Sequence, residues 1–240
     1  LAFTQQGRDL IPLNRGVMQS EHPYWELLVQ PGTVWQETND QGWSRAAVPF
    51  ALQERAANCT HNGVFTWLFN HEGAISRLAY QISSETCAYF KFDMWGTVAV
   101  KRDKTIATDA DITAAVARFE AHRKSRLPVE PLANLSNNYR GIDIDNLAIG
   151  DGVSPTDLSV YGLVVDGIHY RSNCNTRHGA YPFCDAMALP SYSTAKSIYA
   201  GIALMQLENQ MPGISQRSIA ETIPSCEKKS WRKVSIEDAL

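Results

Sequence analysis

Short runs of β-branched and aromatic residues, bounded by Gly, Asn and Ser, recur along the N-terminal half of the chain. Apolar runs of this length, separated by turn-forming residues, are typical of antiparallel strands. Four of them are expected to form strands: Thr33–Gln36, Gly63–Phe69, Leu78–Ile82 and Tyr89–Trp95. The pattern therefore predicts a β-rich N-terminal part.

After these runs the spacing of apolar residues changes to that of a helix. Ile112, Val116 and Phe119 lie three or four positions apart, which places their side chains on one helical face. Thr108 precedes them and is of a residue type that caps helix N-termini. We therefore expect a helix from Thr108 to about Lys124.

Two prolines, Pro128 and Pro131, follow this helix and mark a break in the regular pattern. We expect three parts in the chain. Residues 1–127 are predicted to be a β-rich accessory domain that ends in a helix, residues 128–138 a linker, and residues 139–240 a second domain.

A hairpin is predicted near the start of the second domain. Two β-rich runs within Tyr161–Tyr170 are joined by Asp166-Gly167, a strong signal for a two-residue turn because both positions must tolerate positive φ. Strands combined with helices predict a chain of the α+β or α/β class, with an antiparallel sheet and helices.

A longer apolar run, Ser197–Met205, is predicted to be a helix that ends at Pro212-Gly213. It is apolar on nearly every side, which predicts a helix buried in the centre of a domain. The run is too short to cross a bilayer, so no membrane span is expected.

The net charge of the chain bears on one class of partner, the nucleic acids. The chain has 22 Lys and Arg against 25 Asp and Glu, a formal net charge of −3. This balance gives no electrostatic reason to expect a nucleic-acid partner.

The five cysteines are more informative. Cys174 and Cys184 flank a polar loop, and a disulfide between them would fix that loop against the start of the apolar helix. Cys59 and Cys87 are expected to pair in the N-terminal part, which leaves Cys226 free or bonded to a partner outside this sequence. Two disulfides favour an oxidising compartment. We therefore expect a periplasmic or extracellular protein whose secretory leader, if it had one, was removed before Leu1.

Two alternatives for these cysteines stay open. They can be free buried thiols, or Cys174, His178 and Cys184 can bind a metal. The spacing lacks the Cys-x-x-Cys or His-x-x-x-His elements of common metal sites, so we expect no metal and no cofactor.

Ser193-Thr194-Ala195-Lys196 lies directly before the apolar helix and places a hydroxyl and an amine one helical turn apart. A serine alcohol needs a neighbouring base to become a nucleophile, and a lysine in apolar surroundings can serve because burial favours its neutral form. Unpaired N–H groups at a helix N-terminus can also stabilise an oxyanion. The tetrad thus predicts an activated serine, with Ser193 as nucleophile and Lys196 as base.

The Ser-x-x-Lys tetrad resembles the signature of the serine β-lactamase and penicillin-binding-protein superfamily, in particular its branch of class C β-lactamases, D,D-peptidases and family VIII carboxylesterases. The resemblance extends from about Tyr139 to the C-terminus. Three further segments carry it: Tyr139–Asp143, Tyr161–Tyr170 and Trp231–Leu240. In the last of them, Ser235 and Asp238 have the spacing of a capping box.

This resemblance implies acyl transfer on an ester or amide, a small molecule or an oligomer, through an acyl-enzyme. Tyr192 and His178 are the candidates for lining the substrate cleft. A carboxylesterase or amidase is expected first, and a D,D-peptidase, a β-lactamase or a penicillin-binding-like protein second. A non-catalytic binding protein on the same fold is a further alternative, as is a structural β module with an incidental tetrad.

The family also carries a Tyr-x-Asn or Tyr-x-Ser element and a Lys/His-x-Gly strand after the segment that ends at Leu240. Neither element follows Lys196 in this sequence. We therefore expect residues 139–240 to hold only the N-terminal half of the catalytic domain, and the C-terminal half to lie in the same or another chain.

Overall fold

A computed structural model describes residues 1–57, 59–85, 87, 94–101, 107–144, 154, 158–227 and 230–240. The chain forms two compact units, a first unit over Leu1–Leu189 and a second unit over Pro190–Leu240. Strands and helices together confirm the predicted α+β class. The three parts predicted from the sequence stay a prediction, because the two compact units divide at a different place.

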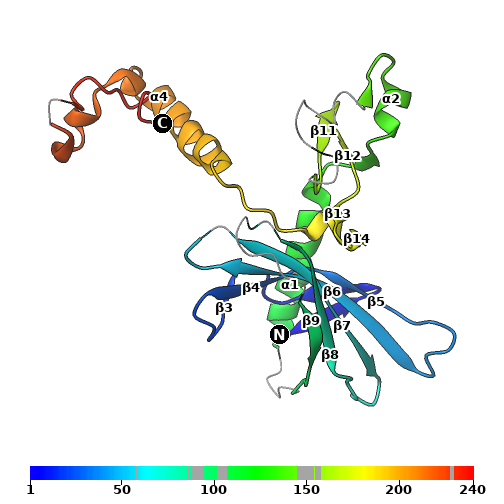
Figure 1. The fold of residues 1–240 in the computed structure, drawn as a ribbon. Helices are drawn as coiled ribbons and strands as arrows, with labels where there is room; N and C mark the ends of the chain where they lie inside the picture. The colour runs from blue at the N-terminus through cyan, green and yellow to red at the C-terminus, as the bar shows by residue number, and fades with distance from the viewer. Residues whose placement is uncertain are drawn as a thin grey trace. The chain divides into compact units, whose positions relative to one another are not determined.

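A large antiparallel sheet is the main element of the first unit (Figure 1). Within the described residues it is built from nine strands: β1 (Phe3–Gln6), β2 (Asp9–Pro12), β3 (Met18–Gln19), β4 (Trp25–Val29), β5 (Gly32–Trp35), β6 (Trp43–Glu54), β7 (Thr60–Asn70), β8 (Leu78–Glu85) and β9 (Trp95–Val98). The main path runs β1-β2-β5-β6-β7-β8-β9, and β4 joins β3 to β6. Three of the four predicted strands are confirmed in β5, β7 and β8. Most of the fourth, Tyr89–Asp93, lies outside the described residues.

β6 pairs with two different strands along one edge. Its residues Arg45–Ala47 pair with β5, and Phe50–Glu54 pair with β4. The chain passes from β4 to β5 through Gly32, where a Cβ atom would lie 2.1 Å from the Ala47 carbonyl oxygen. Only glycine allows this approach, so Gly32 lets two strands share one long partner.

The core of the first unit lies on one face of this sheet. Its buried side chains are Leu10, Val29, Val34, Ala46, Val48, Phe50 and Ile82. Helix α1 (Asp109–Ser125) contacts β1 and β2 and buries Ala115. Thr108 caps it as predicted: the Thr108 hydroxyl accepts from the Asp111 N–H, and the Asp111 carboxylate accepts from the Thr108 N–H.

A smaller cluster follows α1. It contains β10 (Val129–Pro131), α2 (Asn134–Asn138), β11 (Gly162–Val165) and β12 (Ile168–Arg171). The Asp166-Gly167 hairpin is confirmed, with φ of 49° and 78° at the two turn positions. Residues 128–138, predicted as a linker, contain β10 and α2, and their Leu132 and Leu135 are buried with Tyr170 in a second core.

The disulfide loop between Cys174 and Cys184 carries the short strands β13 (Asn175–Thr176) and β14 (Gly179–Ala180) and leads into a 3₁₀ turn, η2 (Cys184–Ala186). Within the first unit it is held against β7. The Tyr181 hydroxyl donates to the Gly63 carbonyl oxygen at 2.8 Å, and burial raises the pKa of Tyr181. Two 2.8 Å hydrogen bonds join the Asn62 side chain to the backbone N–H and C=O of Ala188.

The second unit begins with a helix in two parts, the π-helical turn η3 (Lys196–Gly201) and α4 (Ile202–Gln210). The helix ends as predicted, with Gly213 at φ 87°. In the described residues that follow, three 3₁₀ turns are formed: η4 (Ile214–Gln216), η5 (Ile219–Glu221) and η6 (Pro224–Cys226). Ser235 and Asp238 make the predicted reciprocal bonds, in a turn.

The prediction that this apolar helix is buried is wrong in this structure. Ile198, Tyr199, Ile202 and Met205 are between 48% and 75% exposed. Only the side of the helix that carries Leu204 faces the short turns that follow. Most apolar side chains of the run therefore do not pack against other described residues of the second unit. None of the described helices has both the length and the hydrophobicity that crossing a membrane requires.

Glu208 stabilises the end of α4, and its replacement gives a testable pH effect. Its carboxylate accepts from the N–H groups of Ser215 and Gly213, and these bonds hold the pKa of Glu208 below its usual value of 4.5. A carboxyl whose pKa is lowered by folding stabilises the folded state at pH values above the pKa that it has in the unfolded chain. This stabilisation is lost as the pH falls through the lowered pKa of the folded state. We expect Glu208→Gln to lower the melting temperature at about pH 7 and to lower it much less at about pH 3.

Circular dichroism at the two pH values measures the effect. Glu221→Gln is the matched control, because the exposed Glu221 side chain makes no hydrogen bond to another described residue. An equal loss for Glu208→Gln at both pH values would contradict the role of the ionised carboxylate.

Candidate active site

The predicted nucleophile lies in the tight turn that starts the apolar helix. Tyr192 has a φ of 45°, a left-handed conformation that is unusual for a bulky residue. Three successive bonds then lead into the helix: the N–H groups of Thr194, Ala195 and Lys196 donate to the carbonyl oxygens of Ser191, Tyr192 and Ser193, at 3.0 to 3.2 Å. The tetrad therefore adopts the helical geometry that its spacing predicts.

These bonds change the expected oxyanion site. The amides of Thr194, Ala195 and Lys196 are already used within the turn. The Ser193 N–H makes no hydrogen bond to another described residue. The nucleophile's own N–H is thus left to donate to a bound oxygen.

Ser193 and Lys196 are both exposed. Within the part of the chain that the structure describes, no hydrogen bond joins the Ser193 hydroxyl to the Lys196 amine. The apolar surroundings expected around Lys196 are absent there, for the same reason that the helix is exposed. The arrangement supplies a reachable hydroxyl, an amine one turn away and the amide of Ser193 as a donor.

The structure does not bring the two cleft candidates together in one unit. Tyr192 is 54% exposed and adjoins Ser193 in the second unit. His178 belongs to the first unit, in the turn between β13 and β14. There the backbone N–H of His178 donates to the Thr176 hydroxyl, and the Nε2 atom of the His178 ring accepts from the Arg177 side chain. These bonds fit a role of His178 in stabilising the turn.

Both predicted disulfides are confirmed. Cys59 is bonded to Cys87, Cys174 is bonded to Cys184, and Cys226 is the free cysteine. The metal alternative for the Cys174 loop is thereby wrong, because sulfurs joined in a disulfide are not available as thiolate ligands. No cluster of three or more metal-binding side chains is found among the described residues.

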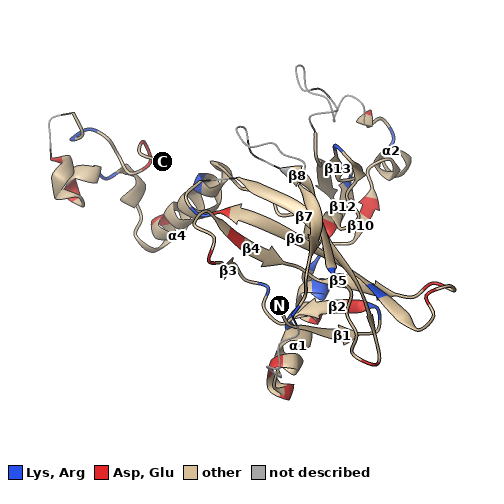
Figure 2. Cartoon of the chain, turned by 60° about the horizontal axis from the view of Figure 1, so that its bottom comes forward, with Lys and Arg blue, Asp and Glu red and all other residues tan. Residues whose placement is uncertain are grey.

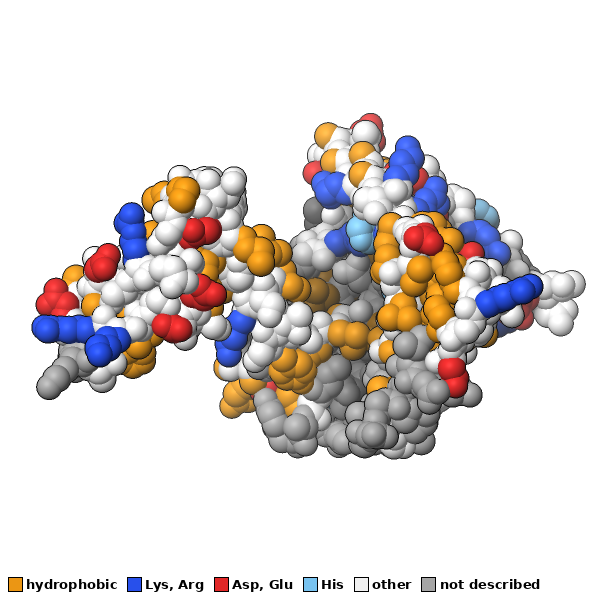
Figure 3. All heavy atoms as spheres, turned by 90° about the horizontal axis from the view of Figure 1, so that it is seen from above, with side chains coloured by type: hydrophobic (Ala, Val, Ile, Leu, Met, Phe, Trp, Pro, Cys, Tyr) orange, Lys and Arg blue, Asp and Glu red, His pale blue; other side chains and the backbone are white. Residues whose placement is uncertain are grey.

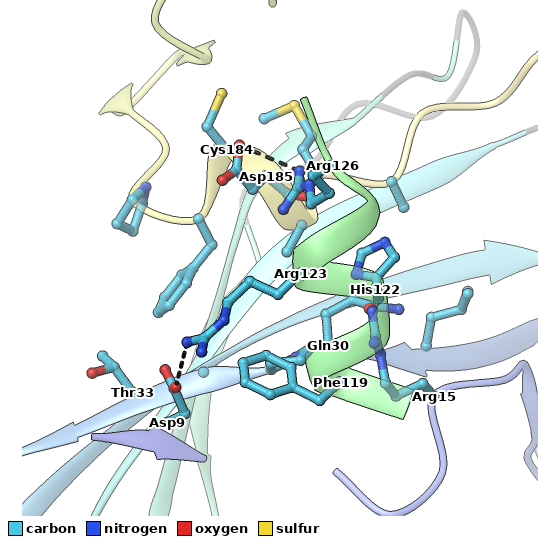
Figure 4. A pocket seen from close by; sticks show the side chains of 18 of the residues that line it. Asp9, Arg15, Gln30, Thr33, Phe119, His122, Arg123, Arg126, Cys184 and Asp185 are labelled. Atoms are coloured by element: carbon cyan, nitrogen blue, oxygen red, sulfur yellow. Dashed lines mark hydrogen bonds and ion pairs between the residues drawn. The ribbon is translucent and has the colours of Figure 1, made fainter. Parts of the chain in front are cut away.

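Sequence reasoning missed a pocket in the first unit, which we call the basic pocket. It has a volume of about 770 Å³ and is lined by Arg15, Arg123, Arg126 and Arg171, by Asp9 and Asp185, and by apolar side chains (Figure 4). One signal for it is present in the sequence. Arg118, His122 and Arg126 follow one another at four-residue intervals, which places three basic residues along one side of α1 and its end.

Elsewhere among the described residues, charged side chains are mixed in sign (Figure 2). Figure 2 shows Lys and Arg mixed with Asp and Glu along the strands and helices. On the face drawn in Figure 3, hydrophobic side chains of the described residues gather in groups, and basic and acidic side chains lie beside them.

Comparisons with protein-family models, curated proteins and solved structures found no match to this chain. The resemblance to the serine β-lactamase superfamily therefore rests on the motifs quoted above.

Proposed function

We propose that this chain belongs to a serine hydrolase that transfers an acyl group from an ester or amide to water. Ser193 attacks the carbonyl carbon while Lys196 takes the hydroxyl proton, and the Ser193 N–H donates to the oxyanion. Return of the proton to the leaving alcohol or amine completes the acyl-enzyme. Water then releases the acid.

One observation supports this proposal most. Ser193 lies exposed where the helix begins, with an amide free to donate and Lys196 one turn further on. Spacing alone is a weaker argument, because Ser230 and Lys233 have the same spacing in an exposed turn. A carboxylesterase or amidase remains our first choice, and a D,D-peptidase, β-lactamase or penicillin-binding-like protein the second.

A fluorophosphonate probe tests the proposal. Attack by Ser193 on phosphorus forms the Ser–O–P bond and expels fluoride, while Lys196 takes the proton. The half domain predicted here is expected to be a poor enzyme alone, so the probe is used with the C-terminal half present. We expect intact-mass analysis to show one adduct, and peptide mapping to place it on Ser193. Ser193→Ala should abolish the adduct, and Lys196→Ala should slow its formation by about 10²–10⁴.

Ser230→Ala is the matched control, since Ser230 has a lysine at the same spacing without the helix, and it should label like the original chain. An adduct that survives Ser193→Ala, or one that disappears in Ser230→Ala, would rule out Ser193 as the nucleophile.

A binding protein without catalysis is the second candidate, and the exposed Lys196 and apolar helix favour it. Its expected result is a folded chain that forms no adduct at any serine. The two disulfides are compatible with secretion, and we propose a periplasmic or extracellular location for either function.

A further inference from the structure

The basic pocket is formed by parts of the first unit that are distant in sequence. Its sides come from α1, from the β4–β5 connection and from the segment Pro182–Ala188. Figure 4 shows Arg123 reaching from α1 toward Asp9, and Arg126 lying beside Asp185. A volume of about 770 Å³ is typical of pockets for small organic ligands.

Three of the four arginines have carboxylate partners. Arg171 and Arg126 share Asp185, at 2.6 and 3.4 Å. Arg123 pairs with Glu120 at 2.8 Å and lies 3.7 Å from Asp9. The lining side chains thus carry two more positive charges than negative ones.

Arg15 differs from the other three. Its Nε and Nη2 atoms donate to one atom, the Gln30 side-chain oxygen, at 3.2 and 2.8 Å. No carboxylate of the described residues lies within ion-pair distance of it. Gln30 therefore orients the guanidinium without neutralising its charge.

Neighbouring positive charges repel one another at this place. Partial burial, together with Arg126 and Arg118, lowers the pKa of Arg15. Burial, together with Arg15 and Arg126, lowers the pKa of His122. An anion between Arg15 and Arg126 would relieve this repulsion.

The apolar side chains of the remaining walls select the rest of the ligand. They include Leu28, Phe119, Phe183 and Met187. We propose that the basic pocket binds a small organic carboxylate with an apolar body, whose carboxylate lies between Arg15 and Arg126. Planar guanidinium groups match a carboxylate in bidentate geometry, and the aliphatic and aromatic walls contact the body.

Isothermal titration of the full chain with three probes tests the ligand class: octanoate, octan-1-ol and inorganic phosphate, at constant ionic strength. We expect octanoate to bind at one site, and both other probes to bind at least about tenfold more weakly. Equal binding of octanol would overturn the role of the arginines. Equal binding of phosphate would overturn the role of the apolar walls, and absence of octanoate binding would overturn the proposal.

Variants then test the position of the site. Arg15→Gln should weaken octanoate binding by about tenfold or more. Arg77→Gln is the matched control: it removes an exposed arginine that bonds Thr97, away from the pocket, and should leave the affinity within about twofold. Where Arg15→Gln fails to fold, Arg126→Gln is the second variant, because Arg126 is exposed. Unchanged octanoate affinity in a folded Arg15→Gln or Arg126→Gln variant would overturn the proposed position of the carboxylate.

Ser193 takes no part in these tests, so their outcome is separate from that of the hydrolase proposal.

Discussion

Replacing Cys59 and Cys87 together with alanine should lower the free energy of unfolding of the first unit by about 3.5 kcal/mol. The two residues are 28 positions apart and buried. Their bond restricts the unfolded chain, and the gain in stability grows with the logarithm of the loop length. The separation of 10 for Cys174 and Cys184 therefore predicts a loss about 1 kcal/mol smaller when that pair is replaced.

Urea unfolding of the two double variants and the original chain measures both losses. Reductant is the internal control: it should destabilise the original chain by more than it destabilises either double variant, because each double variant retains one disulfide. Readily alkylated thiols at Cys59 and Cys87 in the folded, unreduced chain would refute the pairing on which the prediction depends.

Replacing Asn62 with leucine should lower the free energy of unfolding by about 3 kcal/mol, since it leaves two backbone groups without partners. Asn62 is fully buried, and its side chain satisfies both the N–H and the C=O of Ala188. Leucine has a similar size but no polar atoms. The affected segment forms one wall of the basic pocket, so octanoate binding should weaken as well.

Asn137→Leu is the control, because Asn137 is exposed and its side chain makes no hydrogen bond to another described residue. Its effect should stay within about 0.5 kcal/mol. Tyr181→Phe removes a second bond to the same segment, so the two changes together should cost less than the sum of their separate effects. A fully additive result would show that Asn62 and Tyr181 do not hold one cooperative segment.

Features with a local cause could be predicted from the sequence. Thr108 and Asp111 form a cap within one turn, and Asp166-Gly167 supplies the positive φ values of a hairpin within two residues. The two cysteine pairs could also be predicted, because the paired residues are only 28 and 10 positions apart in sequence. Each of these features is determined by residues that are close in sequence, so their pattern is sufficient.

Features that depend on distant residues could not be predicted. The exposed helix around Ile202 has the composition of a buried one, and burial depends on what covers a helix rather than on its own residues. The basic pocket is lined by residues as distant in sequence as Asp9 and Ala188, and Arg15 is oriented by Gln30 from the β4–β5 connection. For the candidate active site, the sequence predicts the spacing of Ser193 and Lys196. The hydrogen bonds of the turn that contains them are seen only in the structure.

The bonds between β7 and the disulfide loop also have a consequence for the order of folding. Asn62 and Ala188 are 126 residues apart, and Gly63 and Tyr181 are 118 apart, whereas β6, β7 and β8 are joined in sequence by hairpins. Closing a long loop costs more entropy than closing a hairpin, so we expect the sheet to assemble first and the segment Pro182–Ala188 to dock late. The same segment should detach early when the protein opens, and its amide protons should exchange with solvent before those of β6 and β7.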